Sequence, residues 1–504
     1  MVAVTAAVEM GARRLVIAAV LLTAGLCAAR LLVIGEFGLF LDEAYYWVWS
    51  QHLSASYYDH PPLIAFAIRL GTVLFGDGAF GVRIVGALSV AVDAWLIYAI
   101  TRVVSDSRRT AAWATIFFNV TTLAAAAVLT VPDQPMMVFW LGALYGLVRI
   151  ARGGSGWWWL LVGAMGGLGA LSKYTLLFLA VAVLLWLVMI PSQRHWLRRP
   201  WPYLAALLAT ALFAPVLWWN ATHDWSSFAL HLNRTGYGFA GWRWDSFGVH
   251  LLLYPLMLGP PVFVLAVLGV GQALRAGWRS DPAKALLLLT MVPLPLYLAW
   301  HSLSEWIGGH WLSPIVASGV IFAALAAERT APAARRLVAF CRRAAVPFGL
   351  AAAGIVYLAL VETFLPLPAG ADVTARFRGW DAFAEDADRL RREAGADYFV
   401  TTDYATAAIL RYQLRETVPV VQLDEPERWS YLDYDPALGD PNATALYVTR
   451  WSSPSEMIRA SRFFASVAPG GVVTRPIRDD RVETVPALIV SDPRNRFRLL
   501  LDPE

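Results

Sequence analysis

Long apolar segments constrain the fold of this chain more than any other feature of its sequence. Crossing a hydrocarbon core takes a helix of roughly 20 mostly apolar residues. About eleven segments are long enough, and they begin near Leu15, Phe80, Thr110, Met136, Trp157, Tyr174, Trp201, Phe247, Ala285, Leu312 and Ala344. The composition agrees, because 58% of the 504 residues are hydrophobic and only 15% are charged. We therefore expect a polytopic α-helical membrane protein.

Basic residues occupy alternate loops between these segments, at residues 102–109, 149–152, 194–199, 275–284 and 329–343. Loops rich in Arg and Lys stay on the cytoplasmic side of a membrane, so we expect these loops and the N-terminus to be cytoplasmic. The formal net charge of +4 follows from these scattered loop residues and not from one basic face. Nucleic acid is excluded as a partner on that ground.

One apolar stretch, residues 157–190, is interrupted only by Ser172 and Lys173. As a single helix, this stretch would invert the alternation of the basic loops that follow it. A break at Lys173 restores the alternation. The sequence therefore predicts two short helices, with Lys173 between them on the non-cytoplasmic side.

The chain changes character after Glu362, where prolines precede a stretch rich in charge and turns. We place a domain boundary here, with a membrane domain at residues 1–365 and a small α/β domain outside the membrane at residues 366–504. The second domain has helix-like and strand-like patterns in alternation, at residues 380–395, 397–403, 405–416 and 418–423. It contains no nucleophile motif, metal-ligand spacing or phosphate loop.

Acidic and aromatic residues cluster after the first apolar segment, in the motifs LDEAYYW and YYDHPPL. These motifs contain Asp42, Glu43, Asp59 and His60. Carboxylates are costly near lipid, so such a cluster usually binds or reacts with something, and the flanking rings suit the boundary between water and hydrocarbon. The structural alternatives are a helix cap for Asp42 and the start of a proline turn for Asp59.

Later loops on the same predicted side add Asp133 in VPDQP, Lys173 in LSKY, and His231 and Arg234 in HLNR. The last two are three residues apart and share one face of a helix. Cations and acids in one region suit a phosphate-bearing ligand with a general base nearby. The structural alternatives are a helix cap for Asp133, a snorkelling side chain for Lys173, and a surface pair for His231 and Arg234.

The motifs DEAYYW, YYDHPPL, FGDGAFGVR, VPDQP, GLGALSKYT and HLNR follow one another over roughly the first 240 residues. Together they resemble the membrane glycosyltransferases of the GT-C fold, in particular the protein O-mannosyltransferase family (glycosyltransferase family 39) and the bacterial transferases that add aminoarabinose or galacturonic acid to lipid A. The resemblance implies about 11 to 13 transmembrane helices and a C-terminal α/β periplasmic domain, in the inner membrane of a bacterium. It also implies inverting transfer of one sugar from a polyprenyl-phosphate carrier to a lipid, glycan or protein acceptor at the periplasmic face.

The same resemblance implies a catalytic pair and a phosphate site. Asp42 is the expected general base at the acceptor hydroxyl, with Glu43 beside it in the catalytic site. Lys173 and Arg234 match positions that bind the carrier phosphate. His60 stands where relatives carry a lysine and is expected to bind substrate.

Three further residues complete the site that the resemblance implies. Asp133 is expected to bind or position substrate. Asp59 and His231 are expected to contact substrate, and they also match a pair that holds a divalent metal ion in relatives. A divalent ion is therefore the one cofactor that the resemblance suggests.

Two other functions stay open on the sequence alone. A transporter or flippase for lipid-linked sugars would account for Asp93, a carboxylate near the middle of the second apolar segment. Against it, the paired broken helices typical of transporters are not evident in the sequence. A membrane receptor or scaffold would depend entirely on residues 369–504. Formation of a new glycosidic bond separates a transferase from both alternatives.

Overall fold

The computed structural model describes residues 2–234, 242–328, 332–362, 372–450, 455–478 and 481–501, without the side chains of residues 2–8 and of Arg234. The chain divides into two compact units. The helical unit contains Met1–Ile34, Asp59–Ala67 and Arg83–Leu358, and the α/β unit contains Gly35–Tyr58, Ile68–Val82 and Ala359–Glu504. The predicted boundary between residues 365 and 366 lies outside the described residues.

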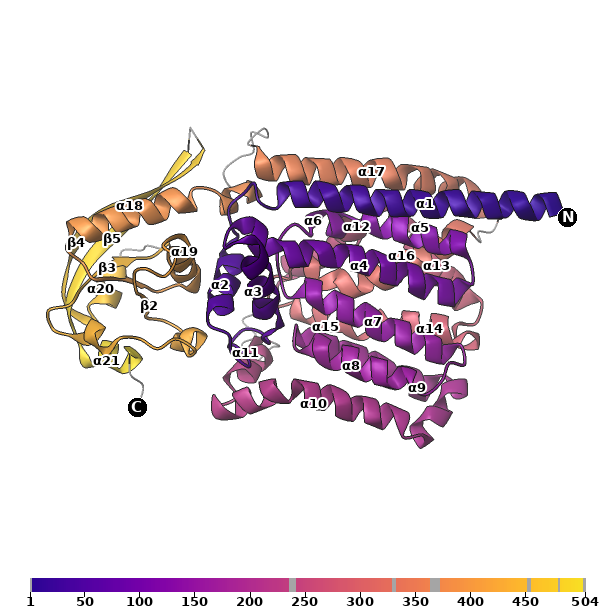
Figure 1. Cartoon of the computed structure of the whole chain (residues 1–504), viewed down its shortest axis with the longest axis horizontal. Coiled ribbons are helices and arrows are strands. Elements are labelled where there is room, and N and C mark those ends of the chain that lie inside the picture. Colours follow the sequence, from indigo (N-terminus) through magenta and orange to yellow (C-terminus); the bar gives the residue numbers. More distant parts are fainter. Residues whose placement is uncertain are drawn as a thin grey trace. The chain divides into compact units, whose positions relative to one another are not determined.

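The helical unit consists of helices joined by short loops (Figure 1). Its helices are α1 (Val2–Val33), α5 (Arg108–Asn119), α6 (Thr122–Ala126), α7 (Asp133–Ala151), α8 (Trp158–Ala170), α9 (Leu177–Met189), α10 (Trp201–Thr222), α11 (Ser226–Arg234), α12 (Trp244–Leu258), α13 (Pro260–Arg275), α14 (Pro282–Thr290), α15 (Pro293–His301) and α16 (Ser313–Glu328). Three more helices have residues in both units: α3 (Leu63–Phe75), α4 (Ala79–Ser105) and α17 (Arg335–Val361).

Several of these helices have the length and composition of membrane spans. Among the described residues, seven helical segments are long and apolar enough to cross a membrane, or up to nine if each of two sharply bent pairs is one span. A helix covers each of the eleven predicted segments, and the predicted fold class is confirmed. Fewer segments qualify as spans because α5 has only 12 residues and α8 only 13.

The predicted break at Lys173 is confirmed. Helix α8 ends at Ala170, Lys173 itself is extended (φ −157°, ψ 136°), and a 3-10 turn at Tyr174–Leu176 leads into α9. Close packing holds α8 in place, because a side chain at Gly163 or Gly167 would collide with the backbone of α10. Small residues four positions apart commonly allow such close approach between membrane helices.

The C-terminal part of the α/β unit is built on a five-stranded sheet with the order β2-β1-β3-β5-β4. Strands β1 (Tyr398–Thr401), β2 (Val420–Gln422) and β3 (Thr444–Val448) are parallel, whereas β4 (Phe464–Arg478) and β5 (Arg481–Pro493) form an antiparallel pair. Buried residues of these strands, including Tyr398, Val400, Tyr447 and Val490, form its hydrophobic core.

Four helices accompany this sheet: α18 (Trp380–Glu393), α19 (Tyr404–Gln413), α20 (Glu456–Ala460) and α21 (Asn495–Leu501). The predicted helices at residues 380–395 and 405–416 are confirmed as α18 and α19. The predicted strands at residues 397–403 and 418–423 are confirmed as β1 and β2. No elements are predicted beyond residue 423, although the longest strands, β4 and β5, lie there.

Helix α2 (Leu41–Gln51), which carries the LDEAYYW motif, belongs to the α/β unit and packs against α19. Its aromatic rings are buried: Tyr45, Trp47 and Trp49 are each no more than 3% exposed. Trp49 stacks on Tyr57 with ring centres 4.2 Å apart, and the Tyr57 hydroxyl donates to the Trp49 carbonyl at 2.9 Å. These aromatic residues therefore fill a protein core.

An ion pair joins the ends of α2 and α19. His52, which follows α2, places its Nε2 2.9 Å from Glu416 Oε2, and Arg411 Nη1 lies 3.0 Å from Glu416 Oε1. Burial acts to raise the pKa of Glu416, but the hydrogen bonds and positive charges of His52 and Arg411 outweigh it and hold this pKa below its ordinary value. The pair therefore stabilises the fold when Glu416 is ionised.

We expect Glu416→Gln to lower the melting temperature at neutral pH and to have less effect in acid. A carboxyl group with a lowered pKa contributes stability above its unfolded pKa and loses it as the pH falls through its folded pKa. Thermal unfolding of both proteins between pH 7 and about pH 3 measures the difference. A difference in melting temperature that stays constant across this range would contradict the prediction.

Candidate active site

Lys173 and Asp133 form a buried ion pair in the helical unit. The Lys173 Nζ lies 2.7 Å from Asp133 Oδ2, and the two side chains are 8% and 5% exposed. Asp133 is the first residue of α7, and Lys173 occupies the break between α8 and α9. Nζ also lies 5.3 Å from the centre of the Trp311 ring. The predicted phosphate-binding cation is thus held at a helix break and has a carboxylate partner.

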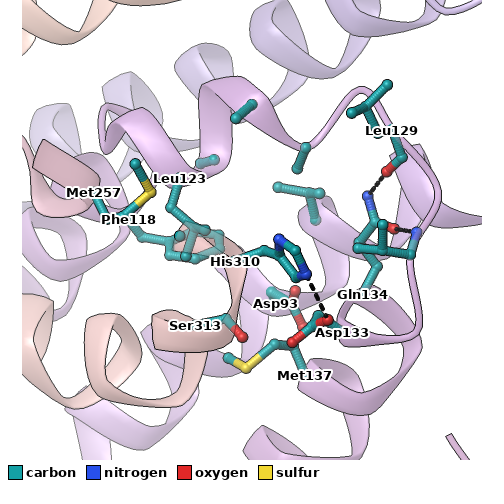
Figure 2. Close-up of a pocket in the computed structure, with 16 residues that line it drawn as sticks. Asp93, Phe118, Leu123, Leu129, Asp133, Gln134, Met137, Met257, His310 and Ser313 are labelled. Atoms are coloured by element: carbon teal, nitrogen blue, oxygen red, sulfur yellow. Dashed lines mark hydrogen bonds and ion pairs between the residues drawn. The ribbon is translucent and has the colours of Figure 1, made fainter. Parts of the chain in front are cut away.

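A cavity of about 290 Å³ is lined in part by Asp133 of this pair (Figure 2). Its lining is mostly apolar and includes Phe118, Leu123, Met137 and Met257. Its polar members are Asp93, Asp133, Gln134, His310 and Ser313. An apolar cavity with a few convergent polar groups is the usual form of a ligand-binding site.

Two carboxylates in this cavity have an unsatisfied oxygen. Asp133 Oδ1 and Asp93 Oδ1 are buried, and neither has a hydrogen-bond partner among the described residues. Figure 2 shows His310 beside them, with its Nε2 3.7 Å from Asp133 Oδ2. Buried polar atoms are nearly always paired, so these oxygens mark a place where a ligand or water can bind. His310 is not among the predicted site residues, because a lone histidine before an apolar segment carries no recognisable pattern.

His231 lies with Asp59 and His60 next to the same helix break. Its Nε2 donates to the main-chain carbonyl of Asp59 at 2.7 Å. The His231 ring centre lies 4.9 Å from that of Tyr174 and 5.9 Å from that of His60. Because Tyr174 directly follows Lys173, this cluster adjoins the ion pair. Three predicted site residues are therefore close together in the helical unit.

A divalent ion between Asp59 and His231 would need further ligands. The hydrogen bond to the Asp59 carbonyl engages His231 Nε2, one of the two ring nitrogens that could bind a metal. Among the residues that the structure describes, no group of three or more His, Cys, Asp and Glu side chains is placed to hold a metal ion. The described residues thus do not form a complete metal site, and the suggested ion stays a prediction.

Asp42 lies in the first turn of α2, in the α/β unit. The Tyr404 hydroxyl donates to Asp42 Oδ1 at 2.9 Å. Tyr404 is the first residue of α19, so this partner comes from a part of the chain whose sequence carries no catalytic motif. A tyrosine at the start of an ordinary helix carries no signal of its own.

Glu43 is fully buried, and its carboxylate accepts a hydrogen bond from the Phe40 main-chain N–H at 2.9 Å. A glutamate at the third position of a helix commonly reaches back in this way to satisfy an N–H before the first turn. The contact gives Glu43 a structural role in starting α2. Its predicted catalytic role stays a prediction.

We expect Glu43→Ala to lower the melting temperature more than Glu43→Gln does. The alanine variant loses the acceptor for the Phe40 N–H, at a cost of about 1–2 kcal/mol, whereas the glutamine carbonyl can still accept this hydrogen bond. Thermal unfolding of the detergent-solubilised proteins, followed by tryptophan fluorescence, measures the melting temperature of each variant against wild type. Equal losses in the two variants would show that α2 requires the charge of Glu43 and not this bond.

The predicted site residues are divided between the two units. Asp42 and Glu43 belong to the α/β unit, whereas Asp59, His60, Asp133, Lys173 and His231 belong to the helical unit. The Arg234 side chain lies outside the described part of the chain. The joint action of all these residues in one site stays a prediction.

The sequence is similar to those of known membrane sugar transferases. Residues 59–219 match the family described as dolichyl-phosphate-mannose-protein mannosyltransferases. A lipid A galacturonosyltransferase of Rhizobium johnstonii is 28% identical over 391 residues, which cover 75% of this chain and 78% of that protein. An undecaprenyl phosphate-α-4-amino-4-deoxy-L-arabinose arabinosyl transferase of Pseudomonas savastanoi is 28% identical over 56% of each chain.

Solved structures share the fold. ArnT from Cupriavidus metallidurans in the apo state has a TM-score of 0.64 at 15% identity, covering 96% of this chain and 99% of that one. The same protein bound to undecaprenyl phosphate has a TM-score of 0.63 at 15% identity, covering 95% and 98%. The GT-C fold and the resemblance to its glycosyltransferases are therefore confirmed, as is the prediction of a glycosyltransferase.

Proposed function

We propose that this chain, which has the GT-C fold and resembles transferases of lipid A and undecaprenyl-phosphate-linked sugars, is an inner-membrane glycosyltransferase. It moves one sugar from a polyprenyl-phosphate carrier to an envelope acceptor at the periplasmic face. The N-terminus is then cytoplasmic and the α/β unit periplasmic, as the charges of the loops predict. Lipid A or a related glycolipid is the proposed acceptor, because the Rhizobium relative is named for lipid A and matches most of the chain.

The buried Lys173–Asp133 pair, whose Asp133 lines an apolar cavity, is the observation that best supports this function. An ammonium group has three N–H donors, and the bond to Asp133 uses one, so a phosphate oxygen can accept another. A fixed cation stabilises the negative charge that develops on a departing phosphate. The apolar lining around Phe118 and Met257 suits the adjoining isoprene units of a carrier.

Asp42 is the proposed general base. The acceptor hydroxyl attacks the anomeric carbon and forms the new glycosidic bond, while its proton passes to the Asp42 carboxylate. The bond between the anomeric carbon and the phosphate oxygen breaks, and its electron pair leaves with the phosphate. Lys173 stabilises this charge. Attack on the face opposite the leaving phosphate inverts the anomeric configuration.

The remaining residues have supporting roles in this proposal. Asp133 balances the charge of Lys173 until the carrier phosphate binds. His60 and His231 contact the substrate beside Tyr174. Arg234 is a second cation for the phosphate, a role that rests on the sequence pattern alone.

Mass spectrometry of envelope lipids and proteins, from cells with and without this chain, tests the function. The expected difference is a lipid A species that is heavier by one sugar residue. A heavier envelope protein would show that the acceptor is protein. No change in either fraction would contradict the proposal.

A flippase and a scaffold are the rival functions. The relatives that match along the chain are named as transferases, which favours bond formation over transport. A flippase would move a labelled carrier across reconstituted vesicles without forming a glycosidic bond. A scaffold would do neither.

A further inference from the structure

A side chain from the C-terminal part of the sequence contacts the proposed base directly. The Tyr404 hydroxyl and Asp42 Oδ1 are 2.9 Å apart, although the two residues are 362 positions apart in the chain. Hydrogen bonds to ionised carboxylates are stronger than those between neutral groups. The contact therefore fixes the orientation of a group on which the proposed reaction depends.

We propose that Tyr404 is a positioning residue for Asp42, and that the C-terminal α/β segment thereby completes the active site of the transferase. The inference rests on the proposed function, because it requires Asp42 to be the base. A carboxylate in the first turn of a helix can rotate about its side-chain bonds, and a fixed hydroxyl selects one of these orientations. Correct orientation of a catalytic group accounts for much of its effect on rate.

The packing of α19 against α2 fixes the place of Tyr404. At the far end of the two helices, His52 pairs with Glu416 at 2.9 Å. Between the ends, the Trp47 ring centre lies 5.2 Å from that of Tyr412, and the Arg415 guanidinium lies 5.6 Å from the Trp47 ring centre. The helices are thus joined along their length, and the Tyr404–Asp42 bond is the contact at the catalytic end.

Two neighbouring side chains, Arg428 and Tyr45, pack against the Tyr404 ring. The Arg428 guanidinium lies 4.6 Å from its ring centre, and the Tyr45 ring centre lies 5.2 Å away. Arg428 is fixed in turn, because its Nε donates to Glu425 at 2.8 Å and its carbonyl accepts from the Tyr45 hydroxyl at 3.2 Å. These contacts hold the Tyr404 ring, and with it the hydroxyl that donates to Asp42.

A purely structural contact and a positioning contact differ in what their loss does. Loss of a structural contact between α2 and α19 lowers stability, and breaking the His52–Glu416 pair should have the same effect. Loss of a positioning contact also changes the titration of the base. Removing a donor from the charged form of a carboxylate raises its pKa, so the acidic limb of the pH–rate profile should move to higher pH.

The test uses the purified full-length protein as wild type, Tyr404→Phe, Glu416→Gln and Tyr412→Phe. Glu416→Gln weakens the other connection between the helices, and Tyr412→Phe removes a hydroxyl from the same helix. Transfer to lipid A is measured from undecaprenyl phosphate-linked 4-amino-4-deoxy-L-arabinose or, if wild type does not use it, from the galacturonic acid counterpart. The readouts are kcat, KM for the donor, the pH–rate profile and the melting temperature.

We expect Tyr404→Phe to lower kcat about 10–100-fold, to change KM for the donor by less than about twofold, and to move the acidic limb to higher pH. Glu416→Gln and Tyr412→Phe should leave the position of that limb unchanged. Should Tyr404→Phe fail to fold, Arg428→Met serves as the second variant. It keeps the hydroxyl but loses the guanidinium, so it should move the limb in the same direction by a smaller amount.

Two sets of results would overturn the inference, and they are distinguishable. An unchanged kcat and pH profile in Tyr404→Phe, or the same shift of the limb in Glu416→Gln, would overturn it and leave the transferase intact. An inactive wild type, or an active Asp42→Asn variant, would contradict the proposed function and the inference with it.

Discussion

Asp42→Asn should abolish sugar transfer while the protein still binds its carrier. Asparagine has nearly the same shape but cannot accept the proton of the acceptor hydroxyl, and general bases contribute about 10²–10⁴-fold to rate. We therefore expect kcat to fall about 10³-fold or more, with little change in affinity for undecaprenyl phosphate. Turnover by the purified variant and binding of undecaprenyl phosphate are the two measurements.

An acid outside the proposed site provides the control for this variant. Asp381→Asn makes the same chemical change at an exposed residue of α18 and should leave turnover within about twofold, as is usual for surface substitutions. Near-normal turnover in Asp42→Asn would remove Asp42 from the role of base. A loss of carrier binding along with turnover would place Asp42 in the donor site instead.

Lys173→Met should weaken the binding of undecaprenyl phosphate at least about tenfold, since a charge-assisted hydrogen bond contributes a few kcal/mol. It should also destabilise the protein, because Asp133 then becomes a buried charge without its partner. Breaking a buried ion pair from one side costs about 3–5 kcal/mol. The single variant alone cannot separate a binding role from a structural one.

The double variant Asp133→Asn/Lys173→Met separates the two roles. Removing both charges avoids the unpaired carboxylate, so the melting temperature should recover most of the loss seen in Lys173→Met. Carrier affinity should stay low, because no cation is restored. Recovery of affinity along with stability would show that the ion pair is structural and that the phosphate binds elsewhere.

Lys284→Met is the matched control for this series. Lys284 pairs with Asp281 at 3.0 Å, but its side chain is 29% exposed, and exposed pairs contribute only about 0–1 kcal/mol. We expect small changes in both melting temperature and carrier affinity. A loss of affinity as large as that of Lys173→Met would show that carrier binding depends on the overall charge of the protein and not on Lys173 in particular.

The parts of this protein that can be predicted from its sequence are those specified by residue patterns within short stretches of the chain. The apolar segments and the alternation of basic loops predicted the helices and the break at Lys173, because burial in lipid and loop charge act on short stretches of chain. The pattern of residues 380–423 likewise predicted two helices and two strands. The site motifs were recognisable because several appear in a fixed order.

The contacts that could not be predicted from the sequence join distant segments of the chain. Nothing near Tyr404 indicates that its hydroxyl bonds to Asp42, and nothing near His310 indicates that it faces Asp133. The aromatic residues of α2 suited a membrane interface by composition, yet they pack in the core of the α/β unit. Such contacts follow from the packing of whole elements, which a local pattern does not encode.

Transfer by the purified protein tests the central claim most directly. An undecaprenyl phosphate-linked sugar and lipid A are incubated with the full chain, and the mass and anomeric configuration of the product are determined. We predict a product heavier by one sugar with inverted configuration, and release of undecaprenyl phosphate in equal amount. Retained configuration, or the same product from Asp42→Asn, would contradict a single displacement driven by this base.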